Sequence, residues 1–152
     1  MKDVNVGICG LGTVGGGTFN VLTRNASLIT GRTGFNLRIA RVATRTPRND
    51  IDLGDIPFST DIFDVVNDPS VDVVVELIGG YETARELVLA AIRNGKHVVT
   101  ANKALIAVHG NEIFEAAAKQ NVIVCYEVGR AGGLLLCTFP WRRDRISMCI
   151  PV

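Results

Sequence analysis

Short apolar runs alternate along the chain with segments in which apolar residues recur at helical spacing. Residues 4–9, 37–43 and 71–78 are apolar runs rich in β-branched side chains. Runs of this length and composition are typical of buried strands. The same pattern predicts further strands at residues 97–100 and 122–127.

Helical patterns fill the intervals between these strands. Helices are expected at residues 13–28, 61–67 and 112–120, and residues 31–34 are expected to break the chain after the first. A further helix has signals at both ends, because Thr83 and Glu86 fit a capping box and Asn94-Gly95 fits a C-terminal stop. Its predicted buried stripe consists of Leu87, Val88, Ala91 and Ile92.

This alternation of strands and helices predicts an α/β fold. The expected architecture is a Rossmann-type, doubly wound, mostly parallel sheet with helices on both faces and right-handed crossovers. The regular pattern indicates one domain over residues 1–133. Residues 134–152 have no clean helical or strand period, so they are expected to form a divergent tail with little regular structure.

Composition and charge exclude several classes of protein. The chain is 47% hydrophobic and 20% charged, which is typical of a globular domain. A formal net charge of +1 gives no electrostatic reason to expect nucleic acid or a membrane as partner. No apolar leader precedes the first strand, so a cytoplasmic location is expected. The four cysteines contain no Cys-x-x-Cys pair, so zinc ligation is not expected.

A glycine-rich motif follows the first strand directly and opens the first helix. It consists of Gly10, Leu11, Gly12, Thr13, Val14 and Gly15. In such motifs the first glycine permits the tight turn, the second lets the backbone approach a pyrophosphate, and the third lets the helix pack close to the sheet. The positive end of the helix would hold the diphosphate of a dinucleotide. The alternative interpretation is a tight turn without a ligand.

The end of the second predicted strand bears on the choice between NAD and NADP. NAD-selective domains place Asp or Glu there to bind the ribose 2′-hydroxyl. This chain has no acid at that point and reads Thr44-Arg45-Thr46-Pro47-Arg48. A guanidinium suits a phosphate by charge and by donor geometry. NADP is therefore favoured, with NAD possible, and Arg45 is the preferred partner because it is nearest the strand. The alternative is two solvated arginines in a surface loop.

Three motifs in order resemble the nucleotide-binding half of homoserine dehydrogenases. They are the glycine motif within residues 6–17, the ELIGGY sequence at residues 76–81 and the VVTANKALI sequence at residues 98–106. The resemblance extends from about residue 2 to about residue 133. It implies NAD(P)H-dependent interconversion of L-aspartate 4-semialdehyde and L-homoserine, a step in threonine, methionine and isoleucine biosynthesis.

The resemblance also implies roles for single residues in cofactor binding. Leu11, Thr13 and Val14 would line the cofactor phosphates, and Gly79 and Gly80 would lie near the ribose on the nicotinamide side.

The third motif contributes Thr100 to the cofactor site and Lys103 as the catalytic candidate. Lys103 would lie between cofactor and substrate, where an ammonium group can bind a ribose hydroxyl or polarise a carbonyl oxygen. The alternative for Lys103 is a surface lysine at the start of a helix.

The family also has a monovalent-cation site, usually for sodium. Its counterparts here would be Glu127 and the backbone carbonyls of Arg130, Gly132 and Leu134. A second half of the family's enzymes supplies the carboxylates that bind substrate, a catalytic lysine and the homodimer interface. The sequence after Gly133 has no match to that half, which predicts a truncation, a shifted reading frame or a divergent end.

Three functional hypotheses remain open at this point. The first is an oxidoreductase of the homoserine dehydrogenase type that is inactive alone and acts on a small-molecule substrate when complete. The second is a stand-alone NADP-binding or regulatory module without catalysis. The third is another dehydrogenase with a similar first half, of the aspartate-semialdehyde or dipicolinate type, which the motif at residues 100–103 disfavours.

Overall fold

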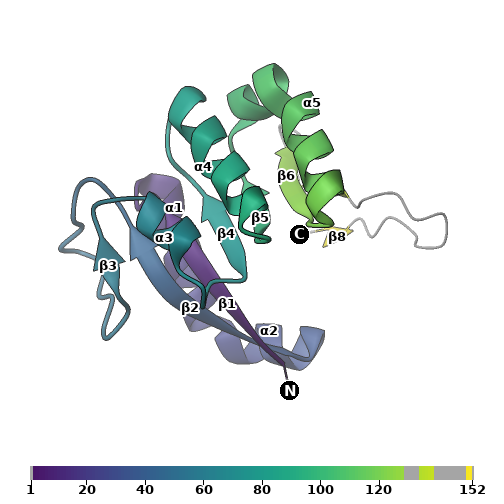
Figure 1. Ribbon diagram of the computed structural model, residues 1–152. Coiled ribbons are helices and arrows are strands. Elements are labelled where there is room, and N and C mark those ends of the chain that lie inside the picture. Colours follow the sequence, from purple (N-terminus) through teal and green to yellow (C-terminus); the bar gives the residue numbers. More distant parts are fainter. Residues whose placement is uncertain (1, 129–133, 139–149, 152) are drawn as a thin grey trace.

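The computed structural model describes residues 2–128, 134–138 and 150–151 (Figure 1). The strands are β1 (Lys2–Cys9), β2 (Phe35–Ala43), β3 (Phe58–Ser59), β4 (Val73–Glu76), β5 (His97–Thr100), β6 (Val124–Val128), β7 (Leu134–Thr138) and β8 (Ile150–Pro151). The helices are α1 (Thr13–Arg24), α2 (Ala26–Thr33), α3 (Phe63–Asn67), α4 (Glu82–Arg93) and α5 (Lys103–Gln120). No helix in these ranges is long and apolar enough to cross a membrane.

The strands form one sheet in the order β3-β2-β1-β4-β5-β6-β7-β8. The pairs from β3 to β6 are parallel, and β7 and β8 add to the edge of β6 in antiparallel pairing. The order 3-2-1-4-5-6 is that of the Rossmann-type doubly wound fold. The predicted fold class is therefore confirmed.

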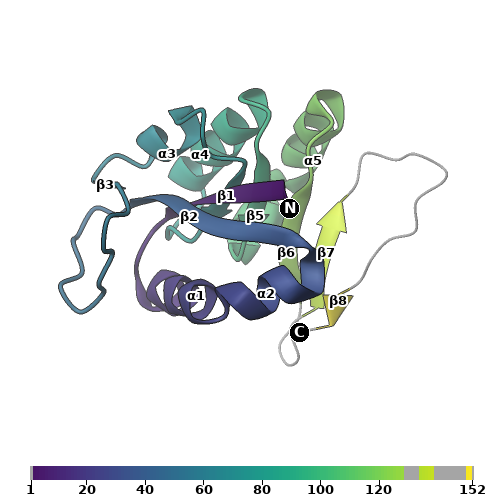
Figure 2. The same cartoon turned by 90° about the horizontal axis from the view of Figure 1, so that it is seen from below.

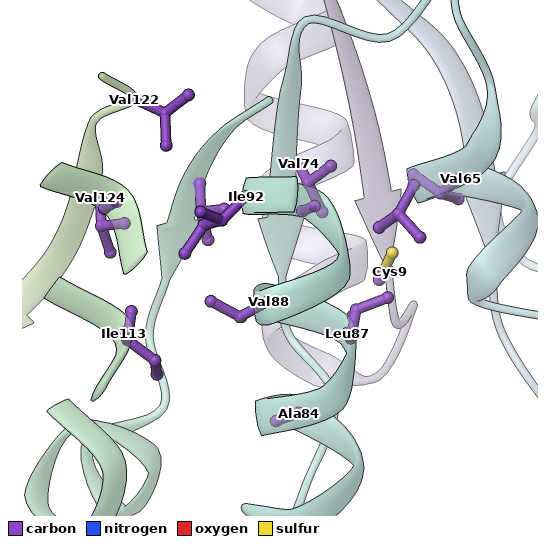
Figure 3. Close-up of a cluster of buried hydrophobic side chains, with 14 of the residues drawn as sticks. Cys9, Val65, Val74, Ala84, Leu87, Val88, Ile92, Ile113, Val122 and Val124 are labelled. Carbon is purple, nitrogen blue, oxygen red and sulfur yellow. The ribbon is translucent and has the colours of Figure 1, made fainter. Parts of the chain in front are cut away.

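Helices cover both faces of the sheet, with α1 and α2 on one face and α3, α4 and α5 on the other (Figure 2). The larger hydrophobic cluster lies between the sheet and α3–α5, as the close-up in Figure 3 shows. The four residues of the predicted α4 stripe all belong to this cluster and are fully buried. Burial of a large apolar side chain stabilises the fold by about 1.5–3 kcal/mol. On the opposite face, Phe19 of α1 packs with Ile8 and Val75.

The single helix predicted at residues 13–28 is wrong, because the structure has two helices that meet at Asn25. Both the backbone N–H and the side-chain Nδ2 of Asn25 donate to the carbonyl oxygen of Val21, at 3.0 and 2.9 Å. A local side-chain bond of this kind competes with regular helix. The predicted break at residues 31–34 occurs only at its end, where Gly34 has a φ of 74° and terminates α2.

The predicted capping box at the start of α4 is also wrong. The N-cap of α4 is Tyr81, and no side chain caps that end, so Thr83 lies inside the first turn. The predicted stop is confirmed, since Asn94 is the C-cap and Gly95 has a φ of 72°.

α5 begins at Lys103, well before the predicted start at residue 112. The cause is Asn102, whose Oδ1 accepts a hydrogen bond from the N–H of Leu105 at 3.1 Å and so caps the helix. The prediction treated residues 98–106 as a functional motif, named a helix start at Lys103 only as the alternative for that residue, and placed the helix itself at residues 112–120.

The expectation of little regular structure after Gly133 is wrong for residues 134–138 and 150–151, which form β7 and β8. In β7, Leu134 pairs with Val128 and Thr138 with Val124. An edge strand such as β6 offers unpaired backbone groups to any extended apolar segment that follows. Residues 139–149 lie outside the described residues.

Two glycines inside α1 allow a test of the packing on that face. A Cβ on Gly17 would have nothing within 4 Å, whereas a Cβ on Gly16 would lie 2.9 Å from Cδ1 of Ile51. Gly17→Ala should raise the free energy of unfolding by about 1 kcal/mol, because glycine is less favourable than alanine in a helix by that amount. Gly16→Ala should raise the free energy of unfolding by less, because the side chain of Ile51 must move to make room for the added Cβ. Urea unfolding of both variants measures the difference, and a destabilised Gly17→Ala would contradict this packing.

Candidate cofactor-binding site

A cavity of about 570 Å³ lies at the carboxyl ends of β1 and β4, which are neighbours in the sheet. The strand order reverses between these two strands, and this is where open α/β sheets bind ligands. Its wall comes from the glycine motif and from the segments that follow β2, β3 and β4. A volume of this size is typical of small-molecule sites.

The three motif glycines lie in different surroundings. Gly10 has a φ of 100°, and a Cβ there would lie 2.7 Å from the carbonyl oxygen of Leu77. A Cβ on Gly15 would lie 1.9 Å from the carbonyl oxygen of Gly10. A Cβ on Gly12 would meet nothing within 4 Å, and Gly12 lines the cavity. Gly10 and Gly15 are therefore required by the fold, whereas Gly12 leaves open space for a ligand.

The amino end of α1 faces this space. Its N-cap is Gly12, no side chain caps the helix, and its first turn contains no acid. The first amides of such a helix have no intrahelical partner and carry partial positive charge. Thr13 and Val14 are exposed at this end, whereas the side chain of Leu11 is buried in the core. Leu11 thus offers its backbone to the cavity.

The segment after β2 supplies two arginines to the cavity wall, and their surroundings differ. Arg48 already has partners within the protein, because its guanidinium pairs with Asp50 and its Nη1 donates to the carbonyl oxygen of Leu11 at 3.1 Å. Arg45 is exposed, and within the described part of the chain it makes no ion pair or side-chain hydrogen bond. The wall also contains the carboxylate of Asp61, whose Oδ1 accepts from the N–H of Phe63 at 2.8 Å.

A second cavity of about 450 Å³ adjoins the first and shares part of its wall, at residues 77–79. It brings together Val14 of α1, the two glycines Gly79 and Gly80 after β4, and Lys103 at the start of α5. Lys103 is exposed. The structure thus places some residues from each of the three sequence motifs around two neighbouring cavities.

Thr100 does not line either cavity. Its side chain is 1% exposed, and its hydroxyl donates to the carboxylate of Glu76. The predicted contact between Thr100 and a cofactor therefore has no counterpart in the cavity walls.

Glu76 is a residue that the sequence analysis did not single out. Its side chain is fully buried, and its Oε1 accepts from the N–H of Ile78 at 2.9 Å. Burial raises the pKa of the Glu76 carboxyl, and hydrogen bonds from Thr100, Ile78 and Asn102 oppose that rise. A glutamate within the apolar run at residues 71–78 was the available signal, because charged residues are rarely buried without partners.

The predicted cation site stays a prediction. The backbone of Glu127 belongs to β6 and that of Leu134 to β7, whereas Arg130 and Gly132 lie outside the described residues. In the described ranges, no three His, Cys, Asp or Glu side chains gather as metal ligands would.

Comparison with known proteins identifies homoserine dehydrogenases as relatives of this chain. Residues 10–127 match the family described as homoserine dehydrogenase, NAD binding domain. The chain is 63% identical to a homoserine dehydrogenase of Pseudomonas aeruginosa over 134 residues, and 50% identical to one of Neisseria gonorrhoeae over 135 residues. Each match covers 88% of this chain and 31% of the relative.

Solved structures of homoserine dehydrogenases also resemble this chain. A homoserine dehydrogenase from Thiobacillus denitrificans superposes with a TM-score of 0.80 at 56% identity, over 88% of this chain and 31% of that one. A homoserine dehydrogenase from S. aureus superposes with a TM-score of 0.75 at 31% identity, over 83% and 33% of the two chains. The chain spans about a third of the length of these relatives, and it belongs to the family of homoserine dehydrogenase NAD-binding domains.

Proposed function

We propose that this chain binds NADP(H) and supplies the cofactor side of the interconversion of L-homoserine and L-aspartate 4-semialdehyde. The observation that carries the proposal is the open space at Gly12, in a chain whose relatives are named homoserine dehydrogenase. The reaction would belong to threonine, methionine and isoleucine biosynthesis. Bound NADP(H) would supply or accept the hydride, and the residues of the chain would hold it in place.

The diphosphate would lie over Gly12, with the uncapped amides of α1 at Thr13 and Val14 as donors. Support comes from the absence of a Cβ at Gly12 and of any acid in the first turn of α1. Backbone amides at a helix start bind phosphate because their partial charges add to the helix dipole.

Arg45 would bind the 2′-phosphate and so favour NADP over NAD. Its support is position and availability, because it lines the first cavity while Arg48 is already paired with Asp50. A guanidinium donates to phosphate in bidentate fashion, which suits a terminal phosphate group.

Lys103 would act at the other end of the cofactor. It lines the second cavity together with Gly79 and Gly80, where the nicotinamide ribose would lie. Its ammonium group would bind a ribose hydroxyl or polarise the carbonyl oxygen of the semialdehyde.

The other groups that the reaction needs are proposed to lie in the region of the relatives that the match does not cover. The match includes 31% of the Pseudomonas relative. The substrate carboxylate ligands, a further lysine and the homodimer interface would belong to that other region, whereas the proposed sodium ligands are Glu127 and the backbone carbonyls of Arg130, Gly132 and Leu134 in this chain. The domain boundary is proposed near residue 133, with residues 134–152 as a divergent tail. A module that binds NADP without catalysis would use the same cavities and differ only in turnover.

The choice of cofactor can be tested at Arg45. The chain should bind NADPH more tightly than NADH, and Arg45→Ala should lower the NADPH affinity by about tenfold, because it removes a charge-assisted hydrogen bond worth about 1.5–3 kcal/mol. The affinity for NADH should be unchanged. Arg38→Ala is the matched control, since Arg38 is an exposed arginine of β2 outside the cavity wall. Calorimetric titration of the wild type and both variants with each cofactor measures all six affinities, and equal wild-type affinities would rule out the NADP preference.

The diphosphate position can be tested at Gly12. Gly12→Val should abolish binding of NADPH and NADH while leaving the unfolding transition in place, because a Cβ at this position has nothing within 4 Å and the side chain would fill the open space. Gly31→Val is the control. A Cβ on Gly31 would also have nothing within 4 Å, but Gly31 belongs to α2. Undiminished cofactor binding by Gly12→Val would mean that the motif is only a turn.

The reaction itself can be tested in a chimaera. Residues 10–127 of this chain would replace the matching region of the Pseudomonas homoserine dehydrogenase, with which the chain is 63% identical. The chimaera should oxidise homoserine with NADP, and Lys103→Met should lower kcat by about 10²–10³-fold, as loss of one polarising group does. Lys119→Met is the control at the far end of α5. A chimaera that binds NADPH but shows no turnover would refute the assignment.

A further inference from the structure

The carboxylate of Glu76 lies in the interior at the end of the central strand β4. In the sheet register it is beside Cys9 of β1 and Thr100 of β5, and its side chain is fully buried. Among the described residues it makes no salt bridge. A buried carboxylate without a cation destabilises the fold unless several hydrogen-bond donors satisfy it. The groups that donate to Glu76 therefore indicate its role.

Those hydrogen bonds lead to two of the three segments that line the second cavity, the loop after β4 and the start of α5. Oε1 accepts from the N–H of Ile78, in the segment after β4, and Oε2 accepts from the hydroxyl of Thr100, at the end of β5. The Thr100 oxygen in turn accepts from the N–H of Asn102 at 3.0 Å. Burial raises the pKa of Glu76, while these hydrogen bonds favour its ionised form.

Asn102 completes the connection. Its Nδ2 donates to the carbonyl oxygen of Gly80, and its Oδ1 accepts from the N–H of Leu105 and caps α5. One side chain therefore ties the loop after β4 to the helix that begins with Lys103. Gly80, Asn102 and Lys103 all line the second cavity.

We propose that Glu76, Thr100 and Asn102 form a carboxylate latch that fixes Lys103 relative to the loop at Gly79 and Gly80, so that the second cavity fits the nicotinamide half of NADP(H). All three are positioning residues for that half. The inference rests on the proposed function, because it takes NADP(H) as the ligand that extends from the first cavity into the second.

The chemistry of the carboxylate explains why glutamate is required. An ionised carboxylate accepts hydrogen bonds at both oxygens, so it satisfies Ile78 and Thr100 together. A glutamine amide has one accepting oxygen, so it can accept from Ile78 but would turn its NH₂ group toward Thr100, whose hydroxyl hydrogen then loses the carboxylate oxygen that accepts it. Glu76→Gln therefore keeps the shape of the side chain and replaces the bond from Thr100 to the carboxylate.

The experiment compares two ligands that differ in reach. NADPH would extend into both cavities, whereas 2′,5′-ADP carries the 2′-phosphate and adenosine but no nicotinamide. In the 152-residue chain, Glu76→Gln should weaken NADPH binding by about tenfold, a loss equivalent to about 1.4 kcal/mol, and should change 2′,5′-ADP binding by less than about twofold. An equal loss for both ligands, or no loss for NADPH, would overturn the latch.

Further variants keep the test decisive if Glu76→Gln does not fold. Thr100→Val removes the hydroxyl at nearly constant volume and should weaken NADPH alone, and Thr100→Ser should restore the affinity because it restores the donor. Thr30→Val is the control, since it removes a hydroxyl bonded within α2. Failure of Thr100→Ser to restore the affinity would overturn the latch.

A wild-type chain that binds 2′,5′-ADP but not NADPH would overturn the latch and leave the first cavity as a nucleotide site. A wild-type chain that binds neither ligand would overturn the proposed function, and the latch with it.

Discussion

The close approach of backbone segments at the β1–α1 turn is the constraint on which the rest of the site depends. The carbonyl oxygen of Gly10 lies 1.9 Å from the position of a Cβ on Gly15, and the carbonyl oxygen of Leu77 lies 2.7 Å from the position of a Cβ on Gly10. These contacts hold the start of α1 against the end of β1 and bring the loop after β4 beside both. Any larger residue at Gly10 or Gly15 would separate them, so the cavity exists because three backbone segments meet without side chains between them.

This arrangement also determines how charge is distributed along the carboxyl edge of the sheet. The uncapped start of α1 lies between Arg45, in the wall of the first cavity, and Lys103, in the wall of the second. Three positive features therefore follow one edge, although the whole chain has a net charge of only +1. Asp50 neutralises Arg48, so the second arginine of the loop supports the backbone of Leu11 instead of adding to the field. The 2′-phosphate and the diphosphate of NADP would match the first two of these features, and Lys103 would face an uncharged oxygen at the nicotinamide end.

Features that depend on local pattern could be predicted from the sequence, and features that depend on single hydrogen bonds could not. β5 was predicted at residues 97–100, where the structure has it, because a buried strand has a strong apolar signal. The break at Asn25 depends on one side-chain bond to Val21, and the early start of α5 depends on one bond from Leu105 to Asn102. β7 was missed because an antiparallel edge strand needs only an extended segment beside β6, not a distinctive period.

The candidate site also contains features that the sequence predicts and features that it does not, and the role of Glu76 is one that it does not. The glycine motif has a fixed spacing within one turn, so its spacing alone indicated the turn, whereas the approach of Gly10 to Leu77 appears only in the fold. Glu76 acts on Thr100, which is 24 positions away, and only the parallel register of β4 and β5 places the two side chains together. Taken alone, Thr100 is a polar residue at the end of a strand beside a cofactor motif, which favours a ligand contact. Its hydroxyl instead donates to the buried carboxylate of Glu76, and the polar residues of this segment in the cavity wall are Asn102 and Lys103.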